Sequence, residues 1–349
     1  MFTPQTYTSL VGLEQTLHSL QELVVKPAAP WLVNIEGIGG IGKTTLADAL
    51  LRHLIQEGLV DNIAWISARQ QRLDLAGRLH LEAKPALTAE ELIDRLIEQL
   101  FPYGLRKNSP EERYNALYDR LHSVQYIVVV DNLETVTDVE ELLPVLQALA
   151  NPSKFIFTSR TTLFGIPNLY HFKMAELSEA SAITLIRQEA EISGLPVLAT
   201  ASDALLRPVY ETVGGSPLAL RLVVGQVHLY PLDAILADLR AVKSHSADTL
   251  YTYIYRKAWE VLNETSRRAL LAMPLADPIG EEITFIAEVG DLEIEELRQA
   301  LNQLVTLSLV NAVGGLCERR YSIHGLTRTF LEYHVAKWLA EPRTSEKSS

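Results

Sequence analysis

The sequence has 349 residues, which corresponds to about two domains at roughly 150 residues each, enough to bury a core without disulfides. An apolar fraction of 48% and a charged fraction of 21% exclude a mostly disordered chain. The formal net charge of -12 disfavours non-specific nucleic-acid binding, which needs a positive field. A single cysteine, Cys317, excludes an intramolecular disulfide and a cysteine-built zinc site, and we expect it to be inert.

Targeting and membrane signals are weak along the whole chain. The strongest apolar run, at 126–130, is far shorter than the ~20 residues that a membrane-spanning helix requires. The N-terminus has neither the basic region nor the apolar region of a secretory signal. The sequence therefore predicts a soluble, cytoplasmic protein with no membrane partner.

The first half of the chain alternates between helical and strand patterns. Apolar spacing predicts helices over 13–24, 43–57, 88–101, 110–122 and 138–149, and apolar runs predict strands over 31–35, 62–67, 126–130 and 154–158. Thr88, followed three residues later by Glu91, has the spacing of a helix-capping box. This alternation, which extends to about residue 172, predicts an α/β fold with a parallel sheet flanked by helices.

The second half has a different pattern. From about 177 to 306 nearly every segment reads as a helix. A short strand pair is expected near 308–323 with Gly314 and Gly315 at its turn, followed by a last helix over about 326–340. Residues 341–349 form a polar tail that we expect to be disordered.

The strongest chemical signal is a glycine-rich segment, GIGGIGKTT, between a predicted strand and a predicted helix. It matches G-x-x-x-x-G-K-[ST] in the context that a phosphate-binding loop requires. Glycines let several backbone N–H groups face a phosphate, and the following helix directs its positive end at the same anion. Lys43 can reach the β- and γ-phosphates, and Thr44 can bind Mg²⁺. The predicted ligand contacts here are Gly37, Gly39, Gly40, Ile41, Gly42, Lys43, Thr44 and Thr45.

A second acidic element follows at the expected distance. The apolar run that ends in Asp131 has the form of a Walker B strand, which places a carboxylate near the Mg²⁺. Thr44 and Asp131 are therefore the predicted metal residues, with ATP or ADP and Mg²⁺ as cofactors.

In this order, the motifs resemble those of the NB-ARC branch of the STAND signal-transduction NTPases, over about 8–340. The segment 10–14 resembles the family's N-terminal hhGRE element, 157–160 its sensor-1 element, 214–219 its GLPL element and 323–325 its MHD motif. Two departures stand out, because Leu13 replaces the arginine of the first element and Gly325 replaces the aspartate of the last.

The resemblance implies a fold of three domains: a P-loop nucleotide-binding domain over 1–174, a helical domain over 175–245 and a winged-helix domain over 246–340. It also implies that Val11 and Gly12 lie near the adenine and that Arg160 approaches the γ-phosphate. Pro217 would pack on the nucleotide, and His324 would approach the β-phosphate of ADP.

Hydrolysis requires a group that orients or deprotonates the attacking water. Many relatives have a second acid directly after the Walker B aspartate, but here that residue is Asn132, whose amide cannot accept the proton. Glu134 is the nearest remaining carboxylate, although it can equally be a solvated loop residue. Lys43, Asp131, Glu134 and Arg160 are the candidate catalytic residues, and we expect slow or conditional ATP hydrolysis.

The combined interpretation is an ATP/ADP-binding regulatory switch whose nucleotide state controls domain closure and self-association. Relatives usually carry an effector before this core and a repeat sensor after it. Three alternatives are therefore open here: a stand-alone core, a piece of a longer chain, or a subunit whose effector and sensor are separate proteins. A DNA-binding winged-helix regulator is the alternative, but residues 250–349 hold 11 Lys and Arg against 14 Asp and Glu, which is poor for phosphate neutralisation. A small-molecule kinase and an AAA+-like ATPase with sustained turnover are further alternatives.

Overall fold

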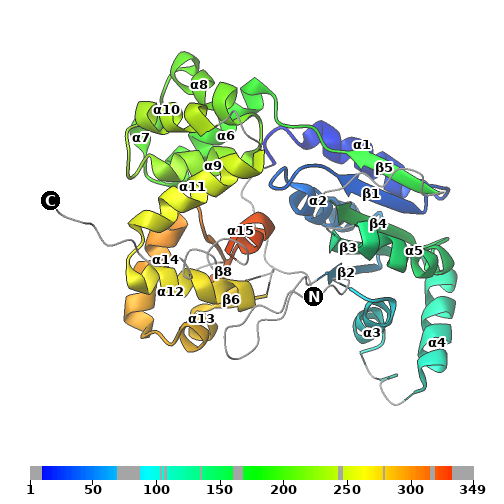
Figure 1. Ribbon diagram of the computed structural model, residues 1–349. Helices are drawn as coiled ribbons and strands as arrows, with labels where there is room; N and C mark the ends of the chain where they lie inside the picture. Colours follow the sequence, from blue (N-terminus) through cyan, green and yellow to red (C-terminus); the bar gives the residue numbers. More distant parts are fainter. Residues whose placement is uncertain are drawn as a thin grey trace. The chain divides into compact units, whose positions relative to one another are not determined.

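The computed structural model describes residues 10–68, 87–102, 104–105, 108–133, 136–159, 168–242, 247–277, 280–314 and 319–331. The chain forms two compact units (Figure 1). The first spans Gly12–Ala175, and the second holds the described residues from Glu176 onward together with Leu10 and Val11. Among the described residues, no helix is long and apolar enough to cross a membrane.

The first unit alternates helices and strands as the sequence predicts. In chain order its elements are α1 (Glu14–Val25), β1 (Leu32–Glu36), α2 (Lys43–Gln56), β2 (Ile63–Ser67), α3 (Ala89–Leu100), α4 (Pro110–Ser123), β3 (Ile127–Leu133), α5 (Val136–Leu149), β4 (Lys154–Ser159) and β5 (Leu169–Lys173). The capping box predicted at Thr88 and Glu91 is present at the start of α3. A second one, formed by Ser109 and Glu112, begins α4.

The five strands form one parallel sheet in the order β2-β3-β4-β1-β5. The predicted parallel sheet is therefore confirmed. Strands β1 and β4 are buried along their whole length, because helices cover both faces of the sheet. Apolar side chains of α3, α4 and α5 pack on one face against Phe155 and Phe157. Helix α2 packs against β3 and β4.

The strand order decides where the site can form. Strand β4 lies between β1, which leads into the glycine-rich loop, and β3, which carries Asp131. The carboxyl ends of parallel strands meet at one edge of the sheet, which is where ligands bind in open α/β sheets. Side chains at the end of β4 can therefore contact residues of both neighbours.

The second unit is mainly helical. Its elements are α6 (Glu179–Ile192), α7 (Pro196–Ala199), α8 (Asp203–Val213), α9 (Pro217–Gln226), α10 (Leu232–Val242), α11 (Ala247–Val261), α12 (Glu264–Ala272), the 3-10 helix η1 (Met273–Leu275), β6 (Glu281–Glu282), α13 (Ile283–Gly290), α14 (Ile294–Thr306), β7 (Asn311–Gly314), β8 (Arg319–Ser322) and α15 (Gly325–Phe330). The predicted strand pair is confirmed as β7 and β8, with β6 added as a third antiparallel strand. The expected turn at Gly315, the end of the last helix and the tail lie outside the described residues.

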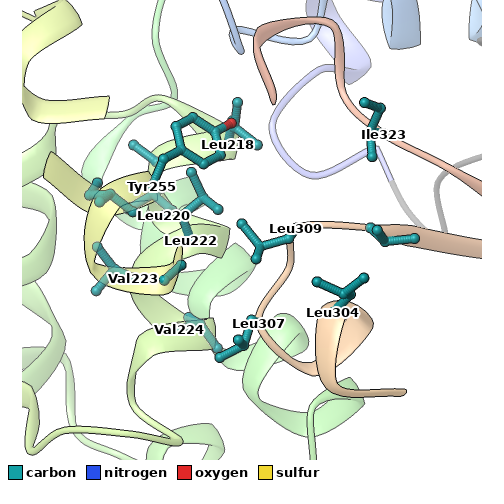
Figure 2. Close-up of a cluster of buried hydrophobic side chains, with 14 of the residues drawn as sticks. Leu218, Leu220, Leu222, Val223, Val224, Tyr255, Leu304, Leu307, Leu309 and Ile323 are labelled. Carbon is teal, nitrogen blue, oxygen red and sulfur yellow. The ribbon is translucent and has the colours of Figure 1, made fainter. Parts of the chain in front are cut away.

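One continuous hydrophobic core joins the segments of the second unit. It runs from Leu177 in the chain before α6 to Leu331 after α15. In Figure 2, Leu222 and Val224 of α9 lie with Leu307 and Leu309, which follow α14. At Gly225 an added Cβ would lie 2.6 Å from the carbonyl oxygen of Leu307, so α9 packs here backbone against backbone. The predicted boundary between a helical and a winged-helix domain stays a prediction.

Candidate functional site

The glycine-rich loop connects β1 to α2, which is the strand–loop–helix context that the sequence predicts. Gly40 and Gly42 have positive φ angles of 79° and 102°, a left-handed backbone that favours glycine. Gly42 is also the N-cap residue of the 14-residue helix α2. The positive end of a long helix therefore begins directly after the loop, and this arrangement binds phosphate in P-loop proteins.

The start of the loop is closely packed. A Cβ added at Gly37 would lie 3.1 Å from Cγ2 of Ile41 and 3.5 Å from Cβ of Met174. Of the two isoleucines in the loop, Ile41 is buried, whereas Ile38 is 45% exposed. A side chain at Gly37 would require Ile41 to shift by a few tenths of an ångström, whereas Gly42 is favoured by its backbone conformation.

Lys43 is the first residue of α2, and its ammonium group lies over the loop. The Nζ atom donates hydrogen bonds to the carbonyl oxygens of Gly37, at 2.7 Å, and Ile38, at 3.0 Å. The positive charge is therefore held at the mouth of the loop, where a phosphate would meet both the ammonium and the N–H groups of the helix start. Thr45 follows in the first turn of the same helix.

Asp131 lies near the carboxyl end of β3 and faces α2. Its Oδ1 atom accepts hydrogen bonds from Thr44 Oγ1, at 2.9 Å, and from Thr158 Oγ1, at 2.6 Å. The side chain is buried, and burial raises the pKa of Asp131. Hydrogen bonds from Thr158 and Thr44 and the nearby charge of Lys43 oppose this rise in the pKa. The contact between Thr44 and Asp131 unites the two halves of the predicted metal site.

Asn132 occupies a bulge in the sheet. The pairing of β3 with β4 shifts between Val130 and Leu133, so that β3 has one residue more than its partner. Asn132 has a left-handed φ of 70°, and its N–H donates to Thr158 Oγ1 at 2.8 Å. Asparagine tolerates this backbone conformation better than most residues. The left-handed backbone of the bulge thus suits an asparagine at this position.

These groups fit a nucleotide with Mg²⁺. Mg²⁺ takes oxygen ligands, commonly one or two from the protein together with phosphate oxygens and water. The hydroxyl of Thr44 and the carboxylate of Asp131 are already within hydrogen-bonding distance of each other, and the Thr44 residue is exposed. The loop, the start of α2 and Lys43 supply the donors for the phosphates.

The other predicted site residues fall elsewhere. Gly12 is the first residue of the first unit, with a φ of 69°, whereas Val11 packs against the core of the second unit. Pro217 is the first residue of α9, and His324 directly precedes α15, both in the second unit. Glu134 and Arg160 lie outside the described residues.

Two residues near the loop were not predicted as site residues. Thr158 contacts both Asp131 and Asn132; it lies in the segment that resembles the sensor-1 element, but its partners follow only once the strand order is known. Met174 follows β5, its N–H donates to the carbonyl of Glu36, and its side chain lies under the loop. No short motif marks this contact.

Comparisons with known proteins agree with this geometry. The model of the NB-ARC domain matches residues 13–190. The chain is 24% identical over 229 residues to a probable disease resistance RPP8-like protein 2 of Arabidopsis thaliana, covering 64% of this chain and 24% of that protein. It is 26% identical over 238 residues to the disease resistance protein RPP8 of the same plant, covering 63% of this chain and 24% of that protein. The chain thus spans about a quarter of the length of these relatives.

A solved structure supports the fold. The chain is similar, with a TM-score of 0.57 and 19% identity, to a signal transduction ATPase with numerous domains (STAND) that has a tetratricopeptide repeat sensor, from Pyrococcus horikoshii. That likeness covers 95% of this chain and 44% of the other. The family match covers the loop, α2 and the strand that carries Asp131, and the likeness to the solved structure agrees with it. The chain therefore belongs to the NB-ARC family of P-loop NTPases.

Proposed function

We propose that this chain is an ATP/ADP-binding regulatory switch in which nucleotide state, rather than turnover, is the output. The observation that carries the proposal is the 2.9 Å hydrogen bond between Thr44 Oγ1 and Asp131 Oδ1. It joins a helix start built for phosphate to a buried carboxylate suited to Mg²⁺. Family membership supports nucleotide binding in signalling, and the proposal extends it to this chain in the cytoplasm.

Binding is tested first, on the purified chain. The protein is denatured and the released nucleotide identified, and near-equimolar ADP would support a stable diphosphate-bound state. Calorimetry with Mg²⁺ then compares Lys43→Ala with Lys26→Ala, an exposed lysine after α1. Lys43→Ala removes a charge-assisted contact of about 1.5–3 kcal/mol, or roughly 10- to 150-fold in affinity, whereas Lys26→Ala keeps the parent affinity. Unchanged ATP and ADP affinity in Lys43→Ala would overturn the proposed site.

Hydrolysis is proposed to be slow, because the residue after Asp131 is an amide that cannot take a proton from water. In this proposal Asp131 holds Mg²⁺, while Lys43 and Arg160 engage the γ-phosphate. Phosphate release is measured for Asp131→Ala, Asn132→Ala and Glu134→Ala. Asp131→Ala abolishes turnover, and loss of turnover in Glu134→Ala would identify the group that activates water. Turnover as fast as that of a remodelling ATPase would contradict the switch.

The switch itself is proposed to depend on differential affinity. A ligand shifts an equilibrium between two states only as far as it binds one of them better. We assign that preference to Pro217 and His324, which would contact ADP more favourably than ATP, so that exchange to ATP releases the second unit for self-association. ADP affinity of Pro217→Ala and His324→Ala tests the assignment, and molecular mass in ADP and in a non-hydrolysable ATP analogue tests self-association. Equal mass in both nucleotides would count against a nucleotide-controlled assembly.

A further inference from the structure

Two tyrosines on α11 bury their hydroxyl groups against other parts of the second unit. Tyr251 and Tyr255 are four residues apart, which places them on the same side of the helix. They are 7% and 2% exposed, respectively. The hydroxyl of Tyr251 lies 2.6 Å from Ser216 Oγ, and that of Tyr255 lies 2.8 Å from Thr327 Oγ1.

The first of these contacts fixes the start of α9. Ser216 is the N-cap residue and Pro217 the first helical residue. A serine in this position commonly accepts a hydrogen bond from the backbone of the first turn, but here its hydroxyl bonds to Tyr251. At the other end of α9, Gln226 Nε2 donates to the carbonyl oxygen of Ile254, at 3.0 Å. Helix α9 is thus joined to α11 at both ends, which sets the position of Pro217.

The second contact fixes the segment that carries His324. The carbonyl oxygen of His324 accepts the N–H of Arg328, at 2.9 Å, so this histidine stands at the start of α15. Thr327 lies in the first turn and bonds to Tyr255. The ring of Tyr255 also stacks on Phe330, with 4.4 Å between the ring centroids. Helix α11 therefore holds α15 by both a hydrogen bond and a ring contact.

The geometry points to Tyr251 and Tyr255 as positioning residues that hold the Pro217 and His324 segments in one arrangement on α11. This inference rests on the proposed function, in which Pro217 and His324 contact ADP. In this inference each tyrosine acts through its hydroxyl partner rather than by binding the nucleotide. A buried hydroxyl needs a partner, so each pair selects one geometry that a phenylalanine would not enforce. The arrangement favours ADP because both contacts are then presented together.

The chain offers a matched control on the same helix. The hydroxyl of Tyr253 donates to Asp238 Oδ2 of α10, at 2.6 Å, so Tyr253→Phe removes a tyrosine hydroxyl bond of the same helix that leads to neither Pro217 nor His324. We expect Tyr251→Phe and Tyr255→Phe each to weaken ADP binding by about 2- to 12-fold, the value of one hydrogen bond, while affinity for the ATP analogue stays within about twofold. Tyr253→Phe leaves the ADP-to-ATP affinity ratio unchanged.

A double variant separates positioning from general stability. If Tyr255 acts through the His324 segment, the variant with both Tyr255→Phe and His324→Ala binds ADP no more weakly than His324→Ala alone. Thr327→Val removes the hydroxyl partner of Tyr255 and should change the ADP-to-ATP affinity ratio by the same factor as Tyr255→Phe. This second variant keeps the test decisive if Tyr255→Phe fails to fold.

Three outcomes would overturn the inference, and each can be told apart from the others. If His324→Ala weakens ADP binding but Tyr251→Phe and Tyr255→Phe behave like Tyr253→Phe, the positioning role fails and the switch stands. If Pro217→Ala and His324→Ala leave ADP affinity unchanged while Lys43→Ala weakens it as expected, the switch assignment fails, and the positioning role with it. Additive effects in the double variant count against the positioning role alone.

Discussion

Replacing Thr158 by valine is the sharpest test of the metal site, because this hydroxyl has two partners. It donates to Asp131 Oδ1 at 2.6 Å and accepts the N–H of Asn132 at 2.8 Å. Valine keeps the shape and removes both bonds. A hydrogen bond to a charged group contributes about 1.5–3 kcal/mol, but this bond is present without ligand as well. We therefore expect the affinity for ATP with Mg²⁺ to fall, with roughly 10- to 150-fold as the upper bound.

The loss should depend on pH in a defined direction. Burial raises the pKa of Asp131, and the bond from Thr158 is among the groups that oppose this rise. Thr158→Val therefore raises the pKa further, so the carboxylate that Mg²⁺ needs forms only at higher pH. The deficit relative to the parent is expected to be larger at pH 6 than at pH 8. At each pH the affinity of the variant is divided by that of the parent, because this ratio cancels the effect of the nucleotide's own titration.

The assay is isothermal titration calorimetry with ATP, with Mg²⁺ or with a chelator, at both pH values. Thr212→Val is the control, because it removes another buried threonine hydroxyl, which donates to the carbonyl of Pro208 at 2.6 Å in α8. Parent-like affinity with Mg²⁺ in Thr158→Val would refute the assigned role. An equal deficit at pH 6 and pH 8 would refute the argument from the pKa of Asp131.

Three further predictions concern stability and are checked by denaturant or thermal unfolding of the nucleotide-free chain. Because the pKa of Asp131 is raised, the folded chain binds this proton more tightly than the unfolded chain, so ionising the carboxylate at higher pH disfavours folding. Asp131→Asn should therefore raise Tm, by about 2–4 °C for each kcal/mol gained. A fall in Tm would contradict this. Gly225→Ala should destabilise the folded chain by about 1–3 kcal/mol despite the better helix propensity of alanine, because the new Cβ would lie 2.6 Å from the carbonyl oxygen of Leu307. A stabilised variant would show that α9 and Leu307 are packed less closely than this. Both polar atoms of the Asn34 side chain are buried without a hydrogen-bond partner among the described residues. Asn34→Val should therefore leave the stability unchanged or raise it by about 1–3 kcal/mol. A clear loss of stability would reveal a partner for the amide.

Much of the first unit follows from the sequence. The loop glycines, Lys43 and the apolar run before Asp131 are local signals, and each lies in the predicted element. The bulge at Asn132 could not be predicted, because a shift in register depends on the neighbouring strand rather than on the residues of β3. The role of Thr158 likewise requires knowledge that β4 lies between β1 and β3.

Prediction was less complete in the second unit for a similar reason. Helical periodicity identifies the helices, but it does not show which of them share a core or that Gly225 meets the backbone of Leu307. Strand β6 is only two residues long and pairs with β8, so no alternation of side chains could indicate it. Tyr251 and Tyr255 look like ordinary core residues until their hydroxyl partners are seen.

The continuous core of the second unit limits how this protein could change shape. Any motion that lifts α9 away from Leu307 brings leucine and valine side chains such as Leu222 and Val224 into water. Each 100 Å² of apolar surface uncovered in this way costs about 2.5 kcal/mol. Uncovering a few such areas therefore costs about as much free energy as the whole stability of a small domain. A state in which α9 is separated from Leu307 could accumulate only if another apolar surface covered the side chains exposed to water.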